Sequence, residues 1–353
     1  MKLLKKGLLV LAGLLVVAYL AGWNLSKSKF DSKLPADIIS QITIAPIEQA
    51  ITIAVTGAGE ILLVTSADQQ GVGGISLSGN NIGYVDAVDA VDAYLDIGRA
   101  QLLVLAATAE SKMYLWENLS IPVVFADKIV AAGTNFSAHA AEVSHAGEPF
   151  LFPKLSVPSS WNAVVADGGR LDHEVEICAV PLSDHYAGDK TPLAYLLCGD
   201  YTDRWLLVKD MDIGGEMGKT GFALGKGGAT HLPIGALLVI PAADDFYQQI
   251  DMKLYVNNDL RQHSKAGLMI WNPMQILERM LKDCNTVYKK LAKEIRLLNS
   301  CDKVPAKTLV LTGTPEGTMF HIATLWNPLF YLASGDVVTA YATYLGITKN
   351  TVQ

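Results

Sequence analysis

The chain has 353 residues, which is long enough for two domains with substantial cores. Its net charge of -7 at pH 7, without a basic stripe in the sequence, argues against nucleic acid as a partner. Half of the residues are hydrophobic (50%), partly because of the N-terminus, and this composition agrees with an enzyme.

The N-terminus reads MKLLKKGLLVLAGLLVVAYLAGW, a basic start followed by an uninterrupted apolar run from Leu8 to Trp23. A helix of this length spans about 24 Å, short of the roughly 30 Å hydrocarbon core, although flanking leucines and snorkelling lysines extend its reach. The run ends without a small-x-small cleavage site, which favours an uncleaved membrane anchor over 1–25; a cleaved secretory signal and a buried helix are the alternatives. The lysines before the run predict a cytoplasmic N-terminus and a periplasmic or extracellular main body, although the lysines after it weaken this asymmetry.

The rest of the chain is expected to be α+β and dominated by strands. Residues 26–35 form a polar linker. Between 36 and 124, apolar runs such as ITIAPIEQAITIAV and ILLVTS alternate with turns, which predicts a small mixed α/β domain. Over 125–353, many short β-rich runs predict a mixed β-sandwich or roll.

Two acids in the run LDHEVEI lie two residues apart, at Glu174 and Glu176. In an extended strand, residues i and i+2 project from the same face, so both carboxylates point to one spot, about 7 Å apart along the strand. Two like charges this close need a compensating cation. A hard divalent ion held by oxygen ligands supplies it, and also accounts for a third acid, Asp200, in YLLCGDYTDRW. A solvated strand edge is the alternative, since charged residues mostly lie on wet faces.

A series of short motifs from about Phe125 to the C-terminus carries a more specific signal. Each motif is short, but their order and spacing together make coincidence improbable. They read NFSAHAAE at 135–142, PFLFPK ending at Lys154, LDHEVEI at 171–177, DYTDR at 200–204, KGGATHLPIG at 226–235, YVNNDLRQ at 255–262 and TGTPEG at 312–317.

In this order the motifs resemble the fumarylacetoacetate hydrolase family. The resemblance implies a β-dominated catalytic fold and metal-assisted attack on a 1,3-dicarbonyl or 2-oxo acid. It also implies that Glu174, Glu176 and Asp200 bind Mg²⁺, or Mn²⁺ or Ca²⁺, which all-oxygen ligation favours over zinc. Such an ion chelates a 2-oxo acid through its carboxylate and keto oxygens, and it stabilises enolate charge as the carbon–carbon bond breaks.

The resemblance also assigns a general base, His139, with Glu142 as its partner. His is the side chain whose unperturbed pKa lies nearest neutrality, so it can activate water. Because residues i and i+3 share a face of a helical turn, the carboxylate can orient the imidazole and support its charged form. The alternative is an ordinary polar histidine among alanines.

Four further residues are expected around the substrate. Lys226, as a catalytic cation, and Arg204, as a substrate-binding one, are assigned to substrate or transition-state anions, because a guanidinium matches carboxylate geometry and an ammonium acts as a point charge. Lys154 and Thr314 are candidates for lining the same pocket, with a surface ion pair or a turn residue as the alternative for each. Leu207 departs from the family pattern, which often has a polar residue three positions after the arginine, so the substrate stays open.

The sequence from Asn272-Pro273 begins like a helix, with an N-cap residue and proline at the first position. Its amphipathic pattern runs to about Asn299, and we expect this extension to pack or to form a subunit contact. On one continuous helix Cys284 and Cys301 would lie about 25 Å apart, whereas a disulfide needs Cα atoms within about 7 Å.

The other two cysteines, Cys178 and Cys198, lie in apolar strand-like runs and are expected to be small core residues. Four free thiols are therefore predicted, even if the domain faces an oxidising compartment. Mass spectrometry of the non-reduced protein would find a joined peptide pair if this expectation is wrong.

These observations predict a membrane-tethered, metal-dependent hydrolase, in a homodimer, that cleaves a carbon–carbon bond in an acylpyruvate-type 2-oxo acid. A hydratase or decarboxylase would use the same enolate stabilisation, and the motifs do not separate these reactions. A non-catalytic binding protein for acidic metabolites is the third possibility.

Overall fold

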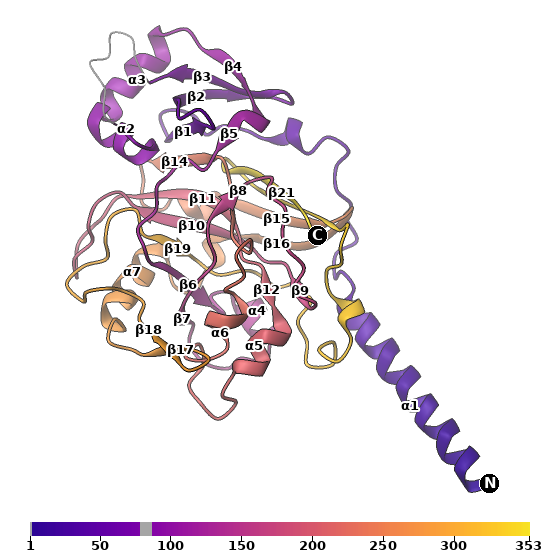
Figure 1. The fold of residues 1–353 in the computed structure, drawn as a ribbon. Helices are drawn as coiled ribbons and strands as arrows, with labels where there is room; N and C mark the ends of the chain where they lie inside the picture. Colours follow the sequence, from indigo (N-terminus) through magenta and orange to yellow (C-terminus); the bar gives the residue numbers. More distant parts are fainter. Residues whose placement is uncertain (1, 78–86) are drawn as a thin grey trace.

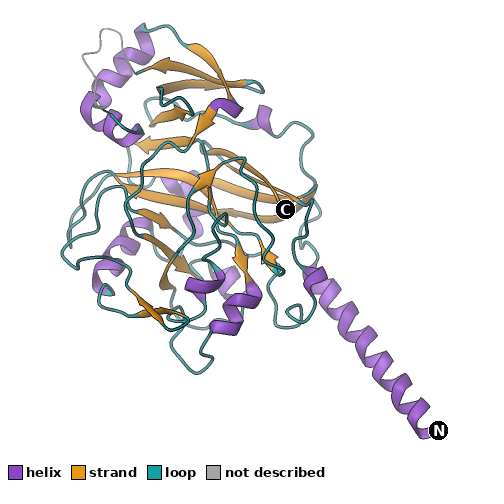
Figure 2. Cartoon of the chain, viewed as in Figure 1, coloured by secondary structure: helices purple, strands orange, loops and turns teal. Residues whose placement is uncertain are grey.

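The structure, a computed structural model, describes residues 2–77 and 87–353, and strands dominate it (Figure 1). Helices and short turns lie around the strands, and one long N-terminal helix projects from the body (Figure 2). The predicted class, α+β with a majority of strands, is confirmed. The helices are α1 (Lys2–Ser26), α2 (Ala90–Ile97), α3 (Arg99–Thr108), α4 (Ser137–Glu142), α5 (Arg204–Asp210), α6 (Phe222–Gly225) and α7 (Pro273–Lys282).

One large sheet runs through the described part of the molecule. Its order is β4 (Lys112–Leu115), β3 (Gly71–Ser76), β2 (Ile61–Ala67), β1 (Ala50–Thr56), β14 (Leu237–Pro241), β11 (Leu193–Gly199), β10 (Val175–Pro181), β19 (Leu309–Leu311), β6 (Ile129–Gly133) and β7 (Phe150–Pro153). The short strands β5 (Leu119–Ser120), β8 (Ser159–Ser160) and β13 (Pro233–Ile234) pair beside this path. Strands β1 to β4 therefore join the same sheet as the later strands, through the antiparallel pair β1–β14. The division at 124/125 stays a prediction.

Three smaller sheets complete the described strands. The largest has the order β16 (Asp259–Lys265), β15 (Asp251–Val256), β20 (Val337–Ala342) and β21 (Gly346–Thr351). The other two pair β12 (Thr202–Asp203) with β9 (Leu171–Asp172), and β17 (Tyr288–Lys290) with β18 (Lys293–Ile295).

Strands β10 and β11 form the centre of the main sheet, and every residue of β10 is buried. Both read as near-continuous apolar runs, VEICAVP and LAYLLCG, which is the pattern of strands covered on both faces. Burial of apolar side chains such as Ile177 and Leu197 stabilises the pair by about 25 cal/mol per Å² of apolar surface removed from water. The pair is therefore a stable support for the residues at its ends. The candidate site lies at one such end.

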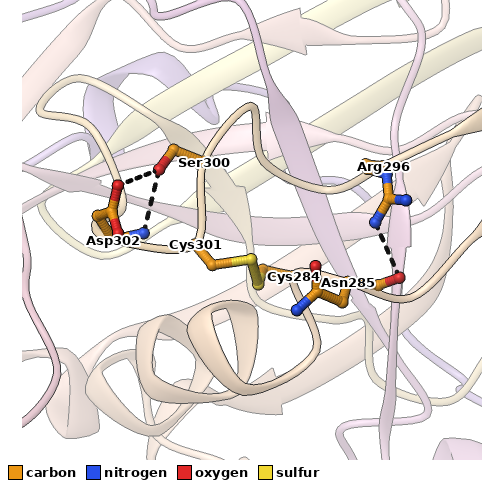
Figure 3. The surroundings of a disulfide bond; sticks show 6 residues. All are labelled: Cys284, Asn285, Arg296, Ser300, Cys301 and Asp302. Atoms are coloured by element: carbon orange, nitrogen blue, oxygen red, sulfur yellow. Dashed lines mark hydrogen bonds between the residues drawn. A yellow bond between two sulfur atoms is a disulfide. The ribbon is translucent and has the colours of Figure 1, made fainter.

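The predicted helix after Asn272 begins as expected but ends early. Asn272 makes a capping box with Gln275, and α7 stops at Lys282 instead of continuing to Asn299. The chain then forms the hairpin β17–β18, and this return brings Cys284 and Cys301 together in a disulfide with Cα atoms 5.4 Å apart (Figure 3). The prediction of a continuous helix was wrong, because the polar run DCNT that follows α7 disfavours further helical turns.

The prediction of free thiols was wrong for the other pair as well. Cys178 and Cys198 are buried core residues, as expected, but they form a disulfide between β10 and β11 with Cα atoms 5.9 Å apart. In this register Cys178 lies opposite Leu196 and Cys198 lies opposite Glu176, so the two cysteines are diagonal neighbours. Diagonal neighbours in paired strands come within reach of each other.

Helix α1 contains a stretch, Lys6–Ser26, that is long and apolar enough to cross a membrane, although a signal sequence would meet the same test. The last turns of α1 contact the body. The ring centroids of Tyr19 and Phe330 lie 5.5 Å apart, and the Phe330 ring leaves no room for a side chain at Gly22. The linker that follows lies along the β15–β16 hairpin, where the backbone N–H of Leu34 donates to the carbonyl of Asn258 at 2.8 Å.

Candidate active site

The three predicted metal ligands lie together at one end of the β10–β11 pair. Glu174 immediately precedes β10, Glu176 is its second residue, and Asp200 directly follows β11. The backbone N–H of Asp200 donates to the carbonyl of Glu174 at 3.0 Å, which fixes the two ends side by side. One oxygen from each carboxylate can be chosen so that all three lie within 4.8 Å of one another, and all three residues are buried. The predicted convergence on one face is present.

Three buried cations surround these carboxylates. The Nζ of Lys226 lies 2.6 Å from Glu174 and 2.7 Å from Asp200, and the Nζ of Lys154 lies 2.6 Å from Asp200. Burial alone would lower the pKa of Lys226, but the attraction of Asp200 and Glu174 outweighs it and raises that pKa. Arg204 donates to Glu174 at 2.5 Å from the start of α5. Glu174 and Asp200 are therefore each held by two cations.

Glu176 differs from its two neighbours because no cation contacts it in the part of the chain that the structure describes. Its carboxylate accepts a hydrogen bond from the backbone N–H of Gly313 at 2.6 Å. Burial, together with the nearby charges of Asp200 and Glu174, raises its pKa well above the ordinary value. A buried carboxylate without a charge partner is unfavourable. When it is ionised, the carboxylate of Glu176 therefore lacks a positively charged partner that the other two acids have.

The fourth acid of this network is Asp172 on β9, which accepts from Nε of Arg204 at 2.7 Å and from the backbone N–H of Met319 at 2.8 Å. When Glu176 is ionised and the three basic groups are protonated, four carboxylates face three cations, which leaves one negative charge in excess. A divalent ion among the three converging carboxylates would remove this excess and turn the centre net positive. The donor set is all oxygen, which fits Mg²⁺, Mn²⁺ or Ca²⁺.

His139 and Glu142 form the predicted pair on α4. Nδ1 of His139 lies 3.1 Å from Oε2 of Glu142, and both side chains are buried. The same carboxylate accepts from the backbone N–H of Gly317 at 3.1 Å and from Nζ of Lys29 at 2.7 Å. Burial raises the pKa of Glu142, but the hydrogen bonds from His139 and Lys29 outweigh it and lower the pKa to about 2. Glu142 is therefore a carboxylate at neutral pH and can hold His139 in one orientation.

A cavity of about 400 Å³ opens beside these groups. Its polar lining includes His139, Glu142, Glu174, Glu176, Arg204, Lys226 and Thr314. Seven of the nine predicted site residues therefore line one space. Lys154 and Asp200 lie behind it, since both are fully buried and neither contacts the cavity.

Two predicted positions take contacts that differ from those expected. Arg204, expected to bind a substrate anion, is occupied by Asp172 and Glu174. Lys154, expected to line the pocket, donates to the carbonyls of Tyr201 and His231, at 3.2 and 3.0 Å, in addition to its contact with Asp200. Both cations thus hold the protein's own acceptors.

Sequence reasoning did not assign three residues that contact the site. Asp172 stood in the LDHEVEI motif and Gln262 in YVNNDLRQ, so both carried a signal; the Nε2 of Gln262 donates to Thr314 at 2.9 Å and its Oε1 accepts from Val175 at 2.9 Å. Lys29 carried none, because its contact with Glu142 joins positions 113 residues apart.

The sequence model of the fumarylacetoacetate (FAA) hydrolase C-terminal family matches residues 128–353, more than half of the chain. The chain belongs to this family. Among curated relatives, "Oxaloacetate tautomerase fahd2, mitochondrial" from Xenopus laevis is 25% identical over 281 residues, 73% of this chain and 77% of the relative. The "2,4-didehydro-3-deoxy-L-rhamnonate hydrolase" of Sphingomonas sp. is 27% identical over 245 residues, 66% of this chain and 75% of the relative.

A solved structure has the same fold as this FAA hydrolase family member. It is the maleylpyruvate hydrolase from Sphingobium sp. SYK-6, crystallised with manganese(II) and pyruvate, with a TM-score of 0.55 and 18% identity. The likeness covers 86% of this chain and 98% of the other. The matched family and its named relatives make this chain an enzyme on a hydrolase, isomerase and tautomerase scaffold.

Proposed function

We propose that this protein hydrolyses the carbon–carbon bond of an acylpyruvate-type 2-oxo acid with the help of a divalent metal ion. The observation that carries the proposal is the carboxylate of Glu176, which is buried beside Glu174 and Asp200 and contacts no cation among the described residues. Next to it stands the His139–Glu142 pair, which lines the same cavity. A metal site and a water-activating base in one space are the two requirements of this reaction.

Glu174, Glu176 and Asp200 are the residues proposed to hold the ion. When bound, it polarises the carboxylate and keto oxygens of the 2-oxo acid and stabilises the negative charge of the enolate. Lys226 stands between Glu174 and Asp200 and supplies a further positive charge beside the substrate's oxygens. Arg204 keeps Glu174 in position through its contact with the same carboxylate.

His139 is the proposed general base. It takes a proton from water, whose oxygen adds to the acyl carbonyl carbon, while Glu142 supports the imidazolium that forms. The bond between this carbon and the methylene then breaks, and its electron pair becomes the enolate of pyruvate. The proton held on His139 passes to the methylene carbon. One water is consumed, and a carboxylic acid and pyruvate are the products.

Product analysis tests the proposal. The purified protein is incubated with acetylpyruvate and Mn²⁺ or Mg²⁺, and pyruvate and acetate are quantified, with EDTA as the metal-free control. We expect equal amounts of the two products, and little of either in EDTA. Metal-dependent binding without any change of the substrate would instead favour a binding protein.

A keto–enol tautomerase is the second candidate, because the relative from Xenopus laevis bears the name of an oxaloacetate tautomerase. The same centre would stabilise the enolate while His139 moves a proton between carbon and oxygen, without adding water. Loss of the enol absorbance of oxaloacetate without release of pyruvate separates this reaction from hydrolysis and from decarboxylation.

The cellular location and the oligomeric state of the protein are further proposals. The apolar part of helix α1 and the lysines in the first turns of the helix favour an N-terminal anchor with the main body outside the cytoplasm. The two disulfides support this side, because such bonds persist in oxidising compartments. A homodimer stays a prediction, which size-exclusion chromatography with light scattering tests.

A further inference from the structure

The cavity changes character along its length. One face of α5 follows this change: Arg204, Leu207 and Val208 line the cavity at positions i, i+3 and i+4, and Met211, the C-cap residue that follows the helix, lines it as well. This face begins at the acidic centre with Arg204 and becomes apolar toward Met211, about 10 Å further along the helix. The cavity is therefore charged at the acidic centre and apolar beyond it.

Other elements extend this apolar surface. Phe150 of β7 and Phe222 of α6 lie edge to face, with ring centroids 5.0 Å apart. Ile213, in the loop after α5, is 90% exposed although it lines the cavity, which places it at the mouth. We call the set Phe150, Leu207, Met211, Ile213, Met217 and Phe222 the apolar wall.

The described cavity lining offers no free guanidinium or ammonium beside the apolar wall. Its two such groups, on Arg204 and Lys226, are bound to the acids of the centre. Two other histidines of the lining each bind a backbone group through one ring nitrogen. Nε2 of His145 lies 3.0 Å from the carbonyl of Glu148, and Nδ1 of His321 accepts from the backbone N–H of Ala323 at 3.0 Å. A second carboxylate on the substrate would lose water there without a fixed cationic partner.

We infer that the acyl group of the substrate is a long alkyl or aryl chain without a charged end. This inference rests on the proposed acylpyruvate hydrolysis and names the class of acylpyruvate. The tail lies along the apolar wall toward Ile213, whose exposed side chain it covers. Leu207 directs the choice, because its apolar side chain offers no hydrogen bond to a polar acyl group.

A homologous series of acylpyruvates measures the tail's contribution. With Mn²⁺ present, kcat/KM is determined for acetylpyruvate, for longer linear acylpyruvates, for benzoylpyruvate and for fumarylpyruvate, which ends in a carboxylate. We expect kcat/KM to rise about fourfold with each added methylene until the apolar wall is covered. Fumarylpyruvate is expected to fall about tenfold or more below an uncharged acylpyruvate of similar size.

Variants assign the effect to the apolar wall. Ile213→Lys places an ammonium at the mouth at an exposed position, where the fold tolerates it, and is expected to lower the ratio of long-chain to acetyl kcat/KM about tenfold. Ile270→Lys is the matched control, at an exposed residue that does not line the cavity, and should keep the ratio.

The outcomes distinguish this inference from the proposed function. Cleavage of acetylpyruvate with a flat chain-length series, or a preference for fumarylpyruvate, overturns the apolar acyl group and leaves hydrolysis in place. If no member of the series is cleaved although metal is bound, both the apolar acyl group and the proposed hydrolysis are overturned.

Discussion

Glu176 and Glu174 are two residues apart in the sequence, yet replacing each by glutamine is expected to change the stability of the metal-free protein in opposite directions. Glu174 is held by Arg204 and Lys226, whereas the contact of Glu176 over residues 2–77 and 87–353 is the backbone N–H of Gly313 and not a cation. The substitution Glu176→Gln keeps an oxygen to accept the hydrogen bond from Gly313. It removes a carboxyl group that, in the metal-free fold, must either hold a proton because of its raised pKa or carry a charge beside two other acids. Glu174→Gln leaves two cations with fewer partners.

The magnitudes follow from the distances. Ionised carboxylates whose oxygens lie within 4.8 Å of one another repel by about 3 kcal/mol or more at an effective dielectric constant of about 20, which sets the scale of the cost of ionising Glu176. The attraction of Lys226 offsets part of this repulsion, so Glu176→Gln should raise the free energy of unfolding in EDTA by about 1–2 kcal/mol. For a chain of this size that is a rise in Tm of about 1–3 °C. Glu174→Gln should lower the free energy of unfolding by about 3 kcal/mol, because it breaks a buried ion-pair network.

Thermal unfolding by calorimetry, in EDTA and in Mn²⁺, measures both effects. Mn²⁺ at about 100 times its Kd adds about 2.7 kcal/mol to the wild type. Both variants should lose most of this gain, since each lacks one proposed ligand. A Glu176→Gln protein that melts below the wild type in EDTA would contradict the charge imbalance at Glu176. A full Mn²⁺ shift in either variant would refute the ligand set.

Three further predictions concern the base, its partner and the disulfides. His139→Ala should lower kcat by roughly 10² to 10⁴ and leave Mn²⁺ affinity nearly unchanged by calorimetry; full activity would place the base elsewhere. Because the pKa of Glu142 is lowered from 4.5 to about 2, its stabilisation, up to about 3 kcal/mol, is complete above pH 4.5 and lost as the pH falls toward 2. Denaturant titrations from pH 7 to about pH 3 should show this loss, and Glu142→Gln should flatten it; parallel curves would be evidence against it. Peptide mapping without reduction should recover Cys284 joined to Cys301, and replacing both by Ser should cost about 3 kcal/mol of unfolding free energy in urea titrations. Recovery of both as free thiols would contradict the hairpin arrangement.

Local periodicity explains which parts of the site could be predicted. Glu174 and Glu176 share a face because strand side chains alternate, and His139 contacts Glu142 because helical residues three apart are neighbours. The ion pairs of Arg204 could not be read in this way. They depend on how β9 lies against α5, which no spacing within a motif encodes.

The disulfides were missed for a related reason. Amphipathic spacing after Lys282 favours one long helix, on which Cys284 and Cys301 would lie far apart, but the chain turns back after α7 and joins them. The polar run after α7 was the available signal for a break. For Cys178 and Cys198 the strands were expected, but their diagonal register depends on pairing between β10 and β11, which only the folded sheet defines.

The segment after α1 gives the proposed anchor a mechanical property. A polar linker of this length would ordinarily behave as a flexible leash. Here Lys33 pairs with Asp259, Leu34 bonds to Asn258, and Lys29 reaches Glu142, the carboxylate that orients His139. These contacts hold the linker against the body, so it is not a flexible connection. Along the chain, the contacts that join α1 to the body are the packing of Tyr19 on Phe330, the hydrogen bond from Ser28 to the carbonyl of Leu260, and the ion pair of Lys29 with Glu142. A tilt of the proposed anchor would therefore load a series of contacts that ends on the carboxylate that orients His139.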